Sequence, residues 1–451
     1  MKNVLRGGGA LVLLMVIGFS LYAARLVRSL ETPEFKARVT REASALVGTR
    51  VQLESLDVSL LRGIRLGGLR ARNPPGFGGD LFTVEGAKLS YDLWPLLLGR
   101  IQVDELTLRR PVITLVPDAR GVFNYQKLSA PAPAGLQAPS PAAAPARLLR
   151  ISVSRLSVDG ARFAIVDERK VEALRLEGGS LDSALAIESG VLTGTGKGSI
   201  DAVAFANAVF LRGVRAPVKL TRERMSLAPL QAKLGGGAVT GEVQVEFKPE
   251  MRYTLQLAVS GASVATLLRE AGSGGTMTGV LNAKARMEGT GGVATLRGAG
   301  SAEIRECRWP RAALFGALAD LLKVPELSDP RFDDCRVEFT VGSGQARTPV
   351  VSFKGPAVEL TGKGVTSLVT SIIDYDLTLA LAPGLLSKVP AQIRAGFKAR
   401  PDGFGTIAFK VTGTTAAPRT DLAARLGKSA AIEAAKEGLL GKLFGSRKKP
   451  Q

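Results

Sequence analysis

The feature that most constrains the fold is an alternation of apolar and polar residues that recurs along most of the chain. Between residues 242 and 247, valine and phenylalanine alternate with glutamate and glutamine, and residues 253–259 repeat the pattern. A period of two places the apolar side chains on one face of a β-strand and the polar ones on the other. Glycine-rich turns, such as residues 234–241 and 272–275, separate the strands. The chain is therefore predicted to be mainly β.

A proline- and alanine-rich segment divides this pattern. Residues 129–147 hold no run of residues that could contribute to a core, which predicts a linker. We expect residues 30–128 to form one domain that begins with a short helix, and residues 148–420 to form a second, β-rich domain. Residues 421–451 predict an amphipathic helix and a basic tail.

The strands are expected to form elongated, twisted antiparallel sheets with few short helices, one of them over residues 312–323. Two arrangements fit the alternation equally well. In one, an open groove leaves the apolar face vacant; in the other, a closed sandwich fills that face with the protein's own side chains.

An uncharged segment near the N-terminus predicts a membrane anchor. Residues 7–24 hold no charged side chain and lie between Arg6 and Arg25. This length is just sufficient to cross a bilayer and exceeds the apolar region of most cleaved signal peptides, which is the alternative interpretation. We expect residues 1–29 to be a cytoplasmic tip and a transmembrane helix. Its apolar side chains are those of Leu11, Leu13, Leu14, Val16, Ile17 and Phe19.

Composition argues against several functional classes. The 451 residues include no histidine, which removes the usual general base near neutral pH and the commonest metal ligand. The formal net charge is +20, but only 5% of the residues are aromatic, and part of the charge lies at the two ends of the chain. This distribution fits a membrane surface better than a nucleic acid. We expect no enzyme activity, no metal and no cofactor.

One glycine-rich motif requires separate treatment. Residues 194–199 read GTGKGS, but the first glycine of a phosphate-binding loop is missing, as it is before residues 427–429. We interpret both segments as turns or helix ends.

Cys307 and Cys335, the two cysteines, bracket the helix predicted over residues 312–323. In an oxidising compartment, a disulfide between them would stabilise the fold by ~3–4 kcal/mol. The alternative is a pair of buried thiols on neighbouring strands, and the sequence favours neither.

Several motifs resemble the AsmA family. In the N-terminal part they are G-x-x-V-x-L with L-x-V-S-L (residues 48–60), NPPGF (73–77), YDLWPLLLGRIQVDELTL (91–108) and RPVITLVPDARGVFNYQKL (110–128). The run at 91–108 is also similar to the opening module of chorein-type bridge-like lipid transfer proteins. Residues 354–383 and 403–422 resemble the C-terminal region of the same family.

The resemblance implies a function and a location. It implies a single-pass protein of the bacterial inner membrane, with the bulk of the chain in the periplasm and without catalytic residues. It further implies phospholipid transfer in outer-membrane biogenesis, with acyl chains carried on the apolar face of a sheet. The alternatives are a non-catalytic assembly scaffold for outer-membrane proteins and an enzyme that acts on envelope glycans. Expected partners are phospholipids, the inner membrane and envelope proteins, but not nucleic acids.

An acyl chain in water is unfavourable by ~0.8 kcal/mol per methylene, so a carrier must leave an apolar face open. The strand residues expected to line such a groove are Val243, Val245, Phe247, Leu255, Leu257, Val337, Phe339, Leu377 and Leu379.

Overall fold

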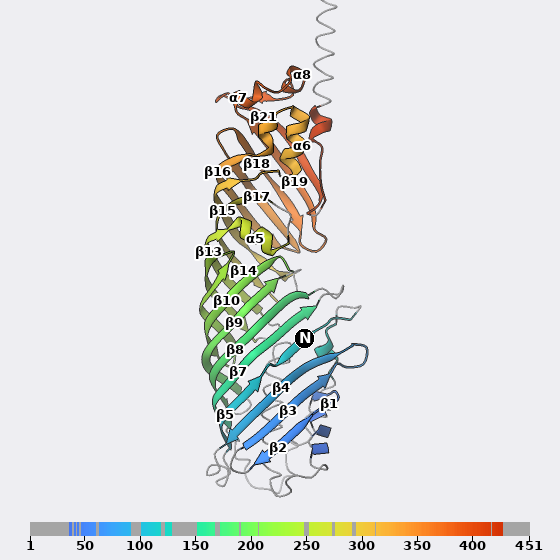
Figure 1. The fold of residues 1–451 in the computed structure, drawn as a ribbon, viewed down its shortest axis with the longest axis vertical. Coiled ribbons are helices and arrows are strands. Elements are labelled where there is room, and N and C mark those ends of the chain that lie inside the picture. The colour runs from blue at the N-terminus through green and yellow to red at the C-terminus, as the bar shows by residue number, and fades with distance from the viewer. Residues whose placement is uncertain are drawn as a thin grey trace, which may run out of the picture. The chain divides into compact units, whose positions relative to one another are not determined.

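The computed structural model describes most of the chain between residues 36 and 426. The residues in that interval that are not described are 38–39, 42, 45–46, 60–62, 92–100, 119–121, 129–150, 167–171, 189–190, 206, 248–251, 273–275, 291–294, 312 and 416. The described chain is mainly β with few helices, as predicted (Figure 1). It divides into unit 1, residues 1–234 and 239–253, and unit 2, residues 235–238 and 254–451.

Unit 1 is a single layer of long strands. The strands are β1 (Val51–Gln52), β2 (Ser55–Ser59), β3 (Gly63–Arg72), β4 (Asp80–Tyr91), β5 (Ile101–Arg109), β6 (Val112–Leu115), β7 (Ile151–Val166), β8 (Glu172–Glu188), β9 (Val191–Phe205), β10 (Val209–Leu220), β11 (Arg224–Leu234) and most of β12 (Gly237–Glu246). From β3 to β5 and from β7 to β11, each strand pairs with the next, and β1 and β2 both pair with β3.

The sheet of unit 1 is mixed, so the prediction of purely antiparallel sheets was wrong here. Strand β7 runs parallel to β5 and β6, with Ile101 opposite Ile151 and Val112 opposite Arg162. Parallel neighbours need a crossover connection of a dozen or more residues, and the chain between β6 and β7 is long enough to provide one. Strands on both sides of residues 129–147 thus belong to one unit. The predicted linker itself lies outside the described residues.

Strands β5 and β6 occupy one position in the sheet, between β4 and β7. They are separated at Arg110, whose φ of 45° interrupts the extended backbone, and at Pro111, which has no N–H to donate. The restriction that Pro111 imposes therefore places it before the start of a strand.

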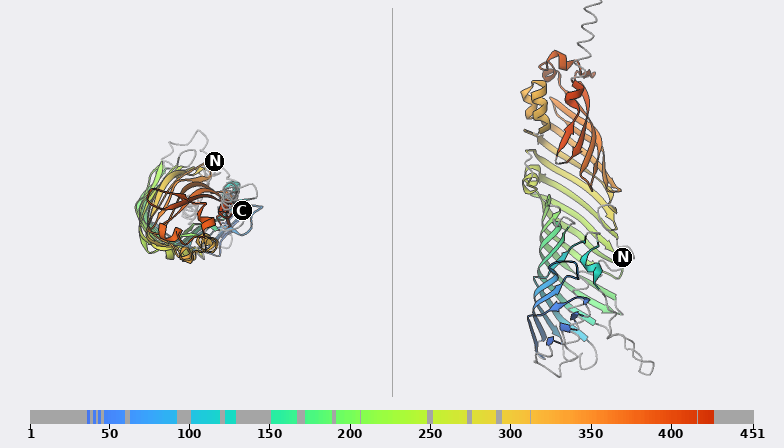
Figure 2. Two further views of the ribbon diagram at one scale, coloured as in Figure 1. Left: turned by 90° about the horizontal axis from the view of Figure 1, so that it is seen from above. Right: turned by 90° about the vertical axis from the view of Figure 1, so that its right-hand side faces the viewer.

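Unit 2 consists of antiparallel strands with short helices between them. Its elements are most of β13 (Arg252–Ser263), α5 (Val264–Glu270), β14 (Thr278–Gly289), β15 (Arg297–Arg308), α6 (Ala313–Leu322), the 3-10 helix η3 (Pro325–Ser328), β16 (Arg331–Gly342), β17 (Gln345–Lys354), β18 (Val358–Ser367), β19 (Ile372–Leu381), α7 (Pro383–Leu386), α8 (Ala391–Arg394), β20 (Lys398–Ala399), β21 (Gly405–Thr414) and β22 (Pro418–Thr420). The helix predicted over residues 312–323 is confirmed as α6. Helices α6, α7 and α8 gather at one end of strands β16 to β21 (Figures 1 and 2).

Helix α6 covers part of the sheet of unit 2 because one of its faces is apolar. Phe315, Leu318 and Leu322 on this face are at most 2% exposed. The ring of Phe315 lies 5.8 Å, between centroids, from those of Trp309 and Phe332. These aromatic contacts form the centre of the core of unit 2.

The two ends of the chain are described only in part. The short helix predicted at the start of the N-terminal domain covers residues 32–48. Its described residues are helical up to Val47, which is buried in the core of unit 1. Residues 422–426 are helical and bury Leu422 and Leu426; the remainder of the predicted C-terminal helix lies outside the described residues.

The predicted anchor, with Leu11, Leu13, Leu14, Val16, Ile17 and Phe19, also lies outside the described residues. Within the described part of the chain, no helix has the length and apolar character needed to span a bilayer.

Truncation of the buried ring of α6 tests this core. We expect Phe315→Ala to destabilise unit 2 by ~3–5 kcal/mol, because the ring is fully buried and its neighbours cannot fill the cavity. Denaturant unfolding followed by tryptophan fluorescence measures the change, since Trp309 contacts the ring. Asp320→Ala on the exposed side of the same helix is the control and should change stability by less than ~0.5 kcal/mol. Equal effects of the two substitutions would contradict the assignment of this core.

Candidate functional site

The register of unit 1 aligns apolar side chains in rows that cross the strands. Residues directly opposite one another on paired strands point to the same face of a sheet. One such row runs from β2 to β11 through Val58, Ile64, Leu89, Leu106, Leu156, Ser183, Gly196, Val218 and Leu227. This row contains no charged residue. We call the face that it marks the apolar face of unit 1.

The burial of the side chains on this face decreases along the row. Leu106 is 0% exposed and Leu156 is 3% exposed, and both belong to the core of unit 1. Val218 and Leu227, further along the same row, are only half-buried. Along this row, the apolar face of unit 1 is therefore a packed core at β3 to β8 and is partly accessible at β10 and β11. Elsewhere on β10 and β11, Val214, Ala216, Leu230 and Ala232 are buried.

Unit 2 has the same arrangement. One row crosses β15, β16, β17, β18, β19 and β21 through Ile304, Cys335, Phe353, Leu360, Leu379 and Ile407. The next row crosses the same strands through Ala302, Val337, Val351, Gly362, Leu377 and Phe409. These rows define the apolar face of unit 2.

The burial of apolar side chains also differs across unit 2. On β16 and β17 it decreases along the strands, away from the helices. Cys335 and Leu379, in the first row, are at most 1% exposed. In the second row, Val337 and Val351 on β16 and β17 are half-buried, whereas Leu377 and Phe409 on β19 and β21 are buried, at 8% and 1% exposed. Ile373, toward the other end of β19, is half-buried. The helices close one end of this apolar face, and the described residues leave its other end partly accessible.

Glycines on the apolar face of unit 2 are covered by large side chains of neighbouring strands. A Cβ at Gly300 would lie 2.5 Å from Phe339 Cζ, and one at Gly364 would lie 2.3 Å from the ring of Tyr375. Both rings therefore lie over glycine backbone, an arrangement that stabilises glycine in sheets. The hydroxyl of Tyr375 forms hydrogen bonds of 3.2 Å with Thr348 Oγ1 and 3.0 Å with Thr366 Oγ1. The ring thus contributes apolar surface without leaving its hydroxyl unpaired.

The contact at Gly300 can be tested by filling the space. We expect Gly300→Val to destabilise unit 2 by ~1–3 kcal/mol, because the new side chain would displace Phe339 and meet the carbonyl oxygen of Lys284. The melting temperature measures the effect. Gly342→Val, where a Cβ meets no atom within 4 Å, is the matched control. If both glycines tolerate valine, the close contact with Phe339 is wrong.

The GTGKGS motif lies inside strand β9, so its interpretation as a turn or helix end was wrong. Gly194, Gly196 and Gly198 face the apolar side opposite Leu185, Ser183 and Leu181 of β8, in the same order. The glycines are required by packing, since a Cβ at Gly196 would lie 2.3 Å from Ser183 Cβ. The second segment, residues 427–429, lies outside the described residues.

Ser183 is the polar residue of the apolar row in unit 1. Its side chain is buried, with a relative exposure of 7%, and its Oγ has no hydrogen-bond partner among the described residues. Sequence reasoning did not single out this residue, because a serine within an alternating strand carries no distinguishing signal.

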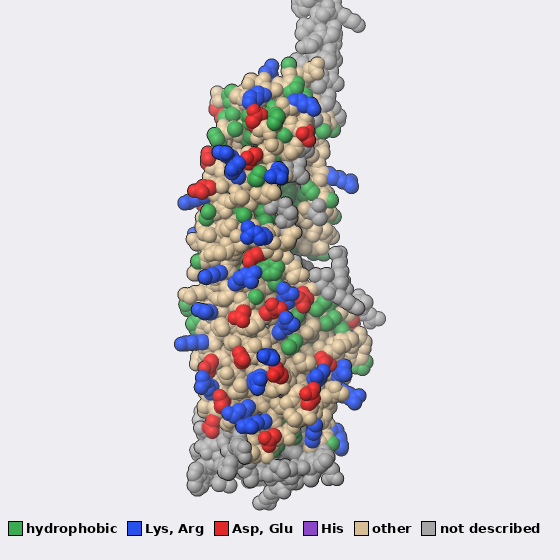
Figure 3. Space-filling view, viewed as in Figure 1, with side chains coloured by type: hydrophobic (Ala, Val, Ile, Leu, Met, Phe, Trp, Pro, Cys, Tyr) green, Lys and Arg blue, Asp and Glu red, His purple; other side chains and the backbone are tan. Residues whose placement is uncertain are grey.

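The opposite face of each unit carries the charged side chains (Figure 3). Arg155 and Asp182 lie on adjacent strands of unit 1 with 2.9 Å between Nη2 and Oδ2, and Lys410 Nζ lies 3.2 Å from Asp374 Oδ1 in unit 2. The hydrogen bond from Arg155 lowers the pKa of Asp182. Such exposed pairs contribute little to stability but keep this face polar.

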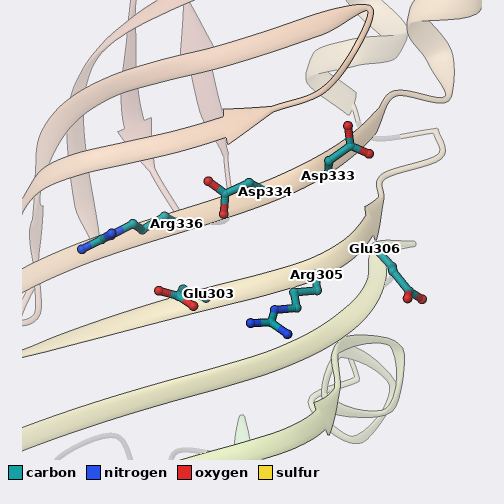
Figure 4. A pocket seen from close by; sticks show the side chains of 6 residues that line it. All are labelled: Glu303, Arg305, Glu306, Asp333, Asp334 and Arg336. Atoms are coloured by element: carbon teal, nitrogen blue, oxygen red, sulfur yellow. The ribbon is translucent and has the colours of Figure 1, made fainter.

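A charged hollow of about 500 Å³ lies on β15 and β16 (Figure 4). It is lined by Glu303, Arg305, Glu306, Asp333, Asp334 and Arg336. Glu303 lies opposite Arg336, and Arg305 lies opposite Asp334, so charges of opposite sign alternate between the two strands. The hollow is a part of the charged face. Among the described residues, no group of three or more histidine, cysteine, aspartate or glutamate side chains is arranged to hold a metal ion.

The residues predicted to line a groove fall into two groups. Val337 and Leu377 share one row of the apolar face of unit 2, Phe339 covers Gly300, and Leu379 is fully buried beneath the helices. Phe339 and Val337 are accessible in part; Leu379 is a core residue.

The second group lies on β12 and β13 and in the residue after β12. Val245 is 8% exposed, whereas Val243, Phe247, Leu255 and Leu257 are half-buried. Their role in lipid binding stays a prediction.

Cys307 and Cys335 are free thiols in this structure, each 1% exposed and in hydrogen-bonding contact with the other. That hydrogen bond and burial raise the pKa of Cys335.

Because both sulfur atoms are buried and alkylation requires access to the sulfur, we expect neither cysteine to react with iodoacetamide at pH 8 in the folded protein. Both should react once denaturant exposes them, which mass spectrometry measures. Alkylation of the native protein would contradict the burial of the pair, and the absence of alkylation after unfolding without reductant would reveal a disulfide.

Comparison with known proteins gives one match. A model of the AsmA family matches residues 1–224. No curated protein and no solved structure matches the chain. The resemblance of residues 354–383 and 403–422 to the C-terminal region of that family lies outside the matched part and stays a prediction.

Proposed function

Because the chain belongs to the AsmA family through residues 1–224, we propose that it transfers phospholipids in outer-membrane biogenesis and holds their acyl chains on its apolar faces. In this proposal the segment at residues 7–24 anchors the protein in the bacterial inner membrane, and the β-rich body lies in the periplasm. The protein acts as a binding surface and carries out no chemical reaction.

The observation that carries this proposal is the incomplete cover of the apolar rows. Val337 and Val351 face the same side as the fully buried Leu379, yet they are only half-buried. The incomplete cover lies at β16 and β17, because Leu377 and Phe409, which continue this row on β19 and β21, are buried. A closed sandwich would bury every row to a similar extent, because side chains of a second sheet would interdigitate with it. The gradient instead supports a face that is packed at one end and receives a guest at the other.

The chemistry of the rows suits an acyl chain. The side chains are aliphatic or aromatic, and the rings of Phe339 and Tyr375 cover the glycine backbone at positions 300 and 364. An acyl chain has no hydrogen-bonding groups, so contact with this surface leaves no polar group of the guest unpaired. Each methylene that leaves water for such a surface contributes about 0.8 kcal/mol.

A charge on the accessible row tests the proposal. We expect Val337→Asp to reduce acyl-chain binding by about tenfold or more, since the carboxylate would have to lose water against hydrocarbon, and tenfold corresponds to only ~1.4 kcal/mol. The measurement is photo-crosslinking of the full chain in native membranes to phospholipid with a photoactivatable acyl chain.

Ala408→Asp is the matched control, because this exposed residue of β21 precedes Phe409 of the same apolar row and points to the opposite face. Melting temperatures show whether both variants remain folded. Equal crosslinking of the two folded variants and the native chain would contradict lipid binding on this face. Consistent absence of lipid from the native chain would instead favour a protein assembly scaffold.

A further inference from the structure

One edge of the sheet of unit 2 consists of turns without charge. Three turns between strands lie there, together with the ends of the strands that they join. None of the described residues in these segments is a lysine, arginine, aspartate or glutamate, although 22% of the chain is charged. The segments are residues 339–346 between β16 and β17, 364–373 between β18 and β19, and 411–415 with 417–418 between β21 and β22.

Hydrogen bonds and strand register place these turns side by side. Leu368 N donates to Gly344 O at 2.9 Å, and Thr415 N donates to Ser371 O at 3.0 Å. Gly298, near the start of β15, lies opposite Val341 beside these turns. The three turns therefore form one continuous edge, which we call the uncharged edge.

Exposed apolar side chains are concentrated at the centre of this edge. Val369 is 68% exposed, Ile372 54% and Leu368 37%. They are three of the six large apolar side chains that are exposed among the described residues. Single exposed apolar residues are common, but a cluster in a hairpin turn marks a contact surface.

The opposite edge of the same unit is different. It carries the ion pairs Arg308–Asp329, Lys388–Glu326 and Arg400–Asp402 around α6, α7 and α8. The same strands run between the two edges, so the difference in charge arises from the segments that connect the strand ends.

We propose that the uncharged edge contacts a lipid bilayer, with Leu368, Val369 and Ile372 inserted at the boundary between head groups and acyl chains. A charged side chain near hydrocarbon is unfavourable, which explains its absence from the described residues of all three turns. The rim of a protein-binding surface, by contrast, is usually polar and charged. The polar residues of the tip are serine and threonine, and Ser367 Oγ accepts hydrogen bonds from Thr370 N and Thr370 Oγ1.

The uncharged edge also adjoins the accessible end of the apolar face. The first row inside it runs through Gly298, Val341, Ala346, Thr366, Ile373 and Gly413, none of which is charged. Arg347, Asp374 and Arg419 lie opposite Thr340, Val365 and Thr412 of this edge and point to the charged face. On the apolar face, an acyl chain could therefore cross this edge without passing a charge. Contact with the bilayer does not depend on acyl-chain binding by that face, and the experiment below separates the two.

The test places a fluorescent label at the tip of the full chain. Val369→Cys is labelled with an environment-sensitive fluorophore, while the native cysteines are 1% exposed and stay unlabelled. The chain is held in phosphatidylcholine nanodiscs. Lipid with a spin label on its acyl chain is present either in the nanodisc or in added phosphatidylcholine vesicles. We expect the spin-labelled lipid to quench the fluorescence of the label at residue 369 in at least one of these two arrangements. The control is Ala391→Cys with the same fluorophore, because residue 391 is exposed in α8 on the opposite edge. Quenching at residue 369 should exceed that at residue 391 by about twofold or more.

A second variant distinguishes the bilayer from a lipid bound by the protein. In the background of Val337→Asp, which blocks the apolar face under the proposed function, quenching at residue 369 should persist. Loss of quenching in that background, with the variant still folded, would show that the quencher was a carried lipid and would overturn the inference. Absence of quenching in both arrangements overturns it as well. A blue-shifted label without quenching would mean that a protein segment covers the edge, which is also contrary to the proposal.

Discussion

The structure depends on the register of strand pairing. A slip of one residue in any pair would move a whole set of apolar side chains to the charged face. The rows through Leu106 in unit 1 and Leu379 in unit 2 exist because many successive pairs keep the same alignment. Register is in turn held by what each row buries, since a slipped strand would expose leucine and bury arginine.

Two different surfaces follow from this one alternation. Where α6 lies over the sheet, the row with Leu379 and Cys335 is a conventional core. Where no described element covers the sheet, the same alternation leaves Val337 and Phe339 accessible in part. The covered rows thus stabilise the fold. In the proposed function, the rows beyond them bind hydrocarbon without loss of that core.

The charged side chains are also distributed unevenly over the surface. The polar face of each unit carries pairs such as Arg155 with Asp182, which keep that face hydrated. The turns of unit 2 separate into a charged edge near the helices and an uncharged edge around Val369. The partly accessible end of the apolar face of unit 2 therefore adjoins the uncharged edge and lies away from the charged edge.

The sequence by itself determined the local features. Alternation predicted the strands, and the helix over residues 313–322 was predicted within one residue at each end, because both depend on the periodicity of neighbouring side chains. The lack of histidine and the family motifs could also be recognised from the sequence alone. The tertiary structure decided which strands pair, and hence that β7 is parallel to β5 and that GTGKGS lies within a strand. It also decided which apolar residues are covered: Leu379 and Val337 have the same pattern in sequence, and only the position of α6 makes the first a core residue and leaves the second accessible. Pairing and cover arise from contacts between residues far apart in the chain, which local periodicity does not encode.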